Sequence, residues 1–135
     1  MTQNLSAKLH FIASQVNDLN PKGKVKANTA NEKGYAKIVS INNSCRVWAH
    51  HTIQNALIID LMYTEHAAAE YPDIVDSAIT TFKKFAKDNG REALPRPWTH
   101  GIDKTSRRQQ HYFDISTDSL ETIGALVTAV KLAFR

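Results

Sequence analysis

The clearest alternation of apolar and polar residues lies at the end of the chain and predicts a strand leading into a helix. In residues 111–116, apolar and polar side chains alternate, so Phe113 and Ile115 share one face of a strand. Asp118 and Glu121 have the spacing of a capping box, with Asp in place of Ser or Thr, and predict a helix start. The helix itself is predicted by apolar residues at steps of three and four, which form one buried stripe: Leu120, Ile123, Val127, Val130 and Phe134.

A second amphipathic helix is predicted over residues 4–19, where the chain begins. It ends at Asn20-Pro21, because proline does not continue a helix. Residues 22–34 are polar, contain two glycines and predict an exposed loop. The buried stripe of the helix again steps by three and four and consists of Leu5, Leu9, Ile12, Val16 and Leu19.

A β-hairpin is predicted over residues 35–49. Residues 35–41 and 44–49 are the two strands, and Asn42-Asn43 can adopt the positive φ angles of a tight turn. The next segment, residues 56–63, fits either a helix or a mostly buried strand. Its content of β-branched and aromatic residues favours the strand.

A long helix is predicted to begin at Pro72 and to end at Asn89-Gly90, after a short alanine-rich helical turn over residues 66–70. Acidic residues near its start and lysines near its end match the helix dipole. Residues 91–110 then predict a long loop, with a short edge strand around Trp98. The buried face of the helix consists of Val75, Ala78, Ile79, Phe82 and Phe85.

This order of elements predicts an α+β fold. We expect a small antiparallel or mixed sheet of about four strands, with three helices packed mainly on one face. The length of 135 residues fits a single domain over residues 1–135. An open sheet edge leaves self-association to a homodimer open.

Composition excludes several classes of protein. Cys45 is the single cysteine, so an intramolecular disulfide and a four-cysteine zinc site are both excluded. No signal sequence is visible in residues 1–6, and the longest apolar run, residues 56–59, stops at Asp60, far short of a membrane span. We therefore expect a soluble, cytoplasmic protein without membrane contact.

The net charge of +4 is unevenly distributed along the chain. Residues 22–37 carry a net charge of +4 and residues 91–108 carry +3, so the rest of the chain is mildly acidic. Two basic segments on an acidic body are typical of a protein that binds a polyanion.

The second basic segment, with the residues that follow it, is the candidate binding loop. Arginine forks suit phosphate oxygens, and flat aromatic side chains can stack on unpaired bases. We expect Trp98 and Tyr112 to stack on bases or to position the loop. The predicted phosphate contacts are Arg96, Lys104, Arg107 and Arg108.

Catalytic and metal chemistry have little support in the sequence. His50 and His51 are adjacent, so a strand would point them to opposite faces, and the six histidines show no metal-binding spacing and are expected at the surface or at edges. Asp60 is unusual inside an apolar strand and is expected to face solvent or to cap a backbone group. Cys45 is expected to pack as a small apolar residue. We therefore predict no catalytic residue, no metal ligand and no cofactor.

Three functional hypotheses follow, and the first is favoured. It is a non-enzymatic nucleic-acid-binding domain, for DNA or RNA, that uses the loop of residues 91–112. The alternative is a protein-interaction module that regulates or inhibits a larger enzyme by presenting the same loop to an acidic protein surface. The third is a small metal-dependent hydrolase or nuclease that uses histidines and carboxylates such as Asp60.

Overall fold

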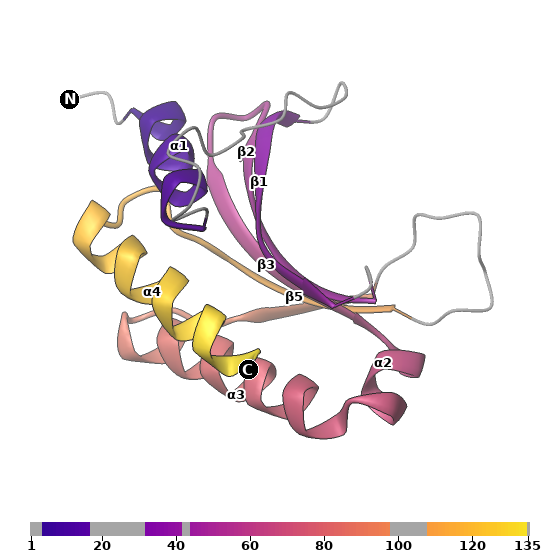
Figure 1. The fold of residues 1–135 in the computed structure, drawn as a ribbon. Helices are drawn as coiled ribbons and strands as arrows, with labels where there is room; N and C mark the ends of the chain where they lie inside the picture. Colours follow the sequence, from indigo (N-terminus) through magenta and orange to yellow (C-terminus); the bar gives the residue numbers. More distant parts are fainter. Residues whose placement is uncertain (1–3, 17–31, 42–43, 98–107, 135) are drawn as a thin grey trace.

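The computed structural model confirms the α+β class, with a five-stranded antiparallel sheet and four helices in the described residues 4–16, 32–41, 44–97 and 108–134 (Figure 1). This is one strand and one helix more than the sequence pattern predicts. The elements are α1 (Leu5–Val16), β1 (Glu32–Ile41), β2 (Cys45–Thr52), β3 (Leu57–Thr64), α2 (Glu65–Glu70), α3 (Pro72–Asp88), β4 (Leu94–Pro97), β5 (Arg108–Asp114) and α4 (Leu120–Ala133).

The sheet has the strand order β1-β2-β3-β5-β4, and every neighbouring pair is antiparallel. Because successive side chains of a strand point to opposite faces, the register divides the sheet residues into two sets. In β2, for example, Val47 and Ala49 are buried on one face, while Arg46, Trp48 and His50 are partly exposed on the other.

Three helices cover one face of this sheet: α1, α3 and α4 all lie on the same side in Figure 1. Their apolar stripes pack against that face, as the patterns of residues 4–19, 72–90 and 120–134 predict. Among the described helices, none is long and apolar enough to cross a membrane. The core formed between helices and sheet includes Leu9, Ile12, Val47, Leu57, Ile59, Leu61, Val75, Phe82, Phe113, Ile115, Leu126 and Val127.

The ambiguous segment around residue 60 is a strand, as its β-branched residues predict. β3 is bonded on both sides, to β2 and to β5, so its backbone groups are paired. It shows no simple alternation, because residues on both faces are buried: Leu61 under the helices and Met62 on the opposite face. Burial on both faces explains why the sequence pattern left helix and strand open.

The start of the last helix differs from its prediction. The N-cap is Ser119, whose Oγ accepts a hydrogen bond from the Thr122 backbone N–H at 3.1 Å. Asp118 is instead in an ion pair with Arg91, at 2.8 Å. Leu120 is 46% exposed, so the buried stripe of α4 begins at Ile123. The predicted N-cap is therefore wrong by one residue, because the Asp118 carboxylate pairs with Arg91 and Ser119 caps the helix.

Other boundaries differ by a few residues. β1 begins at Glu32 rather than at residue 35, and the edge strand expected around Trp98 lies at Leu94–Pro97. The antiparallel pairing of β1 with β2 confirms the hairpin. The predicted turn at Asn42-Asn43, the end of the first helix beyond Val16 and the predicted loop up to residue 31 lie outside the described residues.

Two glycines allow a test of how helices end and continue in this fold. Gly90 follows α3 with a φ of +74°, where its N–H bonds to the Lys87 carbonyl, whereas Gly124 lies inside α4. An added Cβ at Gly124 would make ordinary contact with Phe11, at 3.5 Å. We expect Gly90→Ala to lower the free energy of unfolding by about 1 kcal/mol, and Gly124→Ala to raise it by about 0.5–1 kcal/mol. Urea denaturation measures the free energy of unfolding of both variants. Equal changes of the same sign would contradict the different roles given to Gly90 and Gly124.

Candidate functional site

The sheet face opposite α1, α3 and α4 carries a cluster of polar and aromatic side chains, and we call it the helix-free face because no described helix covers it (Figure 1). One row of this face crosses all five strands in register. With strands about 4.8 Å apart, the row is about 19 Å long. It consists of Lys37, Trp48, Asp60, Tyr112 and Leu94.

Trp48 is the centre of a stacked column on this face. The Tyr35 ring lies parallel to its indole, with centroids 4.9 Å apart and an interplanar angle of 13°. The Arg46 guanidinium lies 3.7 Å from the indole centroid and the Lys37 ammonium lies 5.1 Å from it. The His50 ring is 5.8 Å away. Cations stacked on an indole are held in one orientation by the ring quadrupole, so this column is preorganised.

Asp60 lies beside this column as a buried carboxylate. Its Oδ2 accepts a hydrogen bond from the Gln110 side-chain N–H at 2.9 Å and lies 2.9 Å from His50 Nε2. The side chains of His50 and Asp60 are only 12% and 10% exposed. The expectation that Asp60 faces solvent or caps a backbone group is therefore wrong. The carboxyl group is contacted by side chains from both neighbouring strands, as expected for a buried polar group.

The structure describes only part of the predicted binding loop. Tyr112 lies on the helix-free face, partly buried, in the same row as Trp48 and Asp60. The backbone of Arg96 in β4 is opposite Gln110, and that of Arg108 in β5 is opposite Thr64. The side chains of these two arginines, and all of Trp98, Lys104 and Arg107, lie outside the described residues. Their proposed contacts stay predictions.

Three histidines lie in described strands of the sheet, and they divide between its two faces. His50 and His51 point to opposite faces, as predicted, and His51 Nε2 lies 2.8 Å from Asn55 Oδ1. His51 and His111 are 7% and 8% exposed, so the expectation of surface or edge positions is wrong for these two. Within the described ranges, no group of three or more histidine, cysteine or acidic side chains could hold a metal ion.

Cys45 packs as predicted, as a small apolar side chain. It is fully buried, and burial raises the pKa of its thiol to about 11. A thiol with this pKa is protonated at neutral pH and is a poor nucleophile. Cys45 therefore offers no covalent chemistry to the candidate site.

Sequence reasoning missed the stacked column, although part of its signal is visible. Arg46, Trp48 and His50 occupy alternate positions of a predicted strand, and Tyr35 and Lys37 alternate on its hairpin partner. Alternation places each set on one face, but the turn between the strands has to be known before the two sets can be aligned.

Comparisons of the chain with protein-family models, with curated proteins and with solved structures give no match. The chemistry of the helix-free face is therefore the main evidence on function.

The buried pair of Asp60 and Gln110 predicts a measurable coupling. Gln110→Met removes the amide that donates to the carboxylate, so we expect a loss of about 1–3 kcal/mol in the free energy of unfolding. Asp60→Leu in the same chain removes the charge that needs this donor. The double variant should therefore be more stable than the sum of the two single losses predicts. Additive losses in urea denaturation would show that the hydrogen bond contributes nothing.

Proposed function

We propose that the protein binds single-stranded nucleic acid on the helix-free face of its sheet and catalyses no reaction. The observation that carries this proposal is the preorganised column of Tyr35, Trp48 and Arg46, with Lys37 beside it. A sheet face with aromatic side chains is a surface on which unpaired bases can stack, whereas a duplex keeps its bases covered.

The column assigns different tasks to its members. Arg46 precedes Trp48 by two residues and Tyr35 is opposite His50, so they flank the indole on its two sides along the strand. Both faces of Trp48 are thus in use, and Trp48 acts as a positioning residue. It holds the Arg46 guanidinium flat, and a guanidinium held in one plane is well suited to phosphate oxygens.

Tyr112 supplies the aromatic ring for stacking. It is partly exposed, and no aromatic partner is found for it within the described residues. Along the same row, β3 separates it from Trp48, and β2 and β3 separate it from Lys37. Phosphates would then lie over β1 and β2, near Lys37 and Arg46, with bases directed toward β5. Arg96, Lys104, Arg107 and Arg108 would extend the phosphate contacts beyond the sheet edge.

The test is fluorescence anisotropy with labelled single-stranded and duplex DNA and RNA at two salt concentrations. We expect single strands to bind more tightly than duplexes, with log K falling linearly as log salt rises. Tyr112→Ala should weaken binding about tenfold or more, while Tyr112→Phe keeps the ring and should retain affinity. Tyr71→Ala is the matched control, because Tyr71 is a partly exposed tyrosine next to α2 and α3.

The cations are tested in the same assay. Lys37→Gln should reduce the salt dependence, because one phosphate contact is lost. Lys84→Gln removes an exposed lysine from α3, on the opposite side of the sheet, and should leave binding unchanged. Arg107→Ala/Arg108→Ala tests the loop separately from the sheet.

Absence of binding at low salt would overturn the proposal and favour the alternative, a protein partner with an acidic surface. Arginine and tryptophan are also common anchors of protein interfaces. A protein partner would then be assigned to this face by two results. The captured complex survives nuclease treatment, and the Tyr112→Ala variant no longer captures it. A homodimer paired through the edge strands β1 or β4 would instead appear as a concentration-dependent mass in solution.

A further inference from the structure

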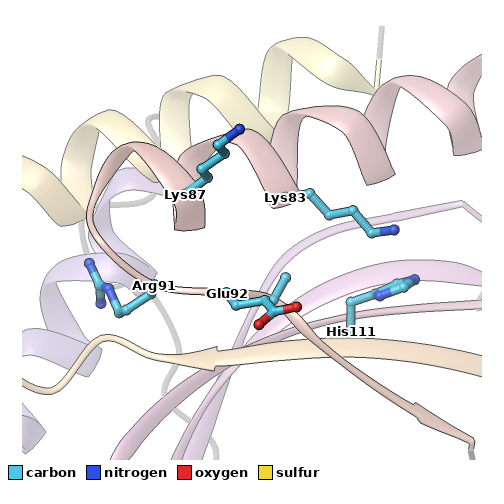
Figure 2. A pocket seen from close by; sticks show the side chains of 6 residues that line it. Lys83, Lys87, Arg91, Glu92 and His111 are labelled. Carbon is cyan, nitrogen blue, oxygen red and sulfur yellow. The ribbon is translucent and has the colours of Figure 1, made fainter.

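A groove of about 560 Å³ lies on the helix-covered side of the molecule, between the second half of α3 and the strand β5 (Figure 2). Its volume is in the range of about 300–1,000 Å³ that is typical of small-molecule sites. It is separate from the helix-free face, because its α3 residues and His111 come from the opposite side of the sheet. The lining residues are Lys83, Lys87, Arg91, Glu92, Ala93 and His111.

The groove is lined by more cationic than acidic side chains. Lys83 and Lys87 are one helical turn apart on α3, and neither ammonium has an ion-pair partner in the described part of the chain. Like charges at this spacing repel one another. Arg91 is engaged by Asp118 and forms one end of the groove, so Glu92 is the acidic group that lines it. An anion between the two lysines would relieve their repulsion.

The carbonyl end of α3 does not oppose an anion here. The backbone N–H groups of Asn89, Gly90 and Arg91 donate to the last carbonyls of the helix, at distances between 2.8 and 3.2 Å. A helix C-terminus carries its partial negative charge on unsatisfied carbonyls. Because these carbonyls are capped, the two ammonium groups dominate the local field.

His111 completes the lining from β5. It is 8% exposed, and its buried Nδ1 has no hydrogen-bond partner among the described residues. Burial lowers the pKa of His111 below its ordinary value of 6.5, and the nearby Lys83 lowers it further. A buried ring nitrogen without a partner is costly, so a ligand group that forms a hydrogen bond with it would be favoured.

We propose that the groove between α3 and β5 is a binding site for a phosphate-bearing small molecule, about the size of a mononucleotide. Lys83 and Lys87 would bind the phosphate oxygens from one side, with His111 facing them from the sheet. Glu92 limits the affinity for a highly charged anion and thus favours a ligand with one phosphate group and a neutral part. This site does not depend on the nucleic-acid function proposed for the helix-free face.

Isothermal titration of the full chain with adenosine monophosphate and with inorganic pyrophosphate tests the site. Each of Lys83→Gln and Lys87→Gln should weaken binding about tenfold, since a charge-assisted hydrogen bond is lost. Glu92→Gln should tighten pyrophosphate binding several-fold. Lys84→Gln is the matched control, because Lys84 lies next to Lys83 in sequence but is paired with Asp88 at 3.0 Å and does not line the groove.

The ligand's source is resolved by competition. A mononucleotide that binds more tightly than pyrophosphate identifies a small molecule, whereas displacement of the mononucleotide by a single-stranded oligonucleotide assigns the same contacts to nucleic-acid phosphates. No binding of either probe at low salt, or equal losses in Lys84→Gln and Lys83→Gln, would overturn the proposal. Tyr112→Ala should leave mononucleotide affinity unchanged, which separates this test from that of the helix-free face.

His111 gives the site a pH dependence with a definite sign. Its folded-state pKa lies below 6.5, so its contribution to stability is fully present above that pH and is lost as pH falls through the folded-state value. A bound anion offsets Lys83 and stabilises the imidazolium, so it should raise this pKa. Sulfate, whose own charge is constant over this range, should therefore bind more tightly as pH falls.

The imidazole resonance of His111, followed by NMR with and without sulfate, measures this shift directly. His111→Gln should abolish the pH dependence of sulfate affinity while keeping binding at high pH. The charged groups that line the same groove are Lys83 and Lys87 from α3 and Arg91 and Glu92 from the connection to β4, and the Tyr63 ring of β3 stacks on the imidazole, with centroids 6.1 Å apart. A His111 pKa that sulfate leaves unchanged would contradict the proposed contact.

Discussion

The register of β3 is the constraint on which both faces of the molecule depend. β3 is the central strand, bonded to β2 and to β5, and its residues alternate between the core and the helix-free face. A slip of one residue would move Asp60 under the helices and Leu61 to the helix-free face. Because the core strongly disfavours a buried charge without partners, the apolar set of β3 determines where the polar set lies.

The two candidate surfaces use cations in different ways. On the helix-free face, Arg46 is stacked on Trp48, so its orientation is fixed before any ligand arrives. In the groove, Lys83 and Lys87 have long, flexible side chains that are not paired within the described part of the chain. A guanidinium in a fixed orientation favours ligands whose oxygen atoms match its planar geometry, whereas flexible ammonium groups attract anions with little dependence on their geometry. The two candidate surfaces thus differ in how firmly the protein holds their cations.

The fold follows from local patterns more completely than the candidate site does. Each amphipathic stripe and the Pro72 and Gly90 signals place an element within a few residues, because they depend on neighbours in sequence. The row from Lys37 to Leu94 depends on cross-strand register, in which β5 lies between β3 and β4. The ion pair of Asp118 could not be predicted from a local pattern either, because its partner Arg91 is 27 residues away in sequence. Only the assembled sheet brings such residues together.

The ion pair of Arg91 and Asp118 has a consequence for the edge of the sheet. It joins the connection before β4 to the connection after β5, close to where the pairing of the two strands begins at Leu94 and Tyr112. β4 is an edge strand of four residues, bonded to β5 alone. An edge strand this short frays easily, so a tether at its start lowers the population of states in which β4 is detached from the sheet.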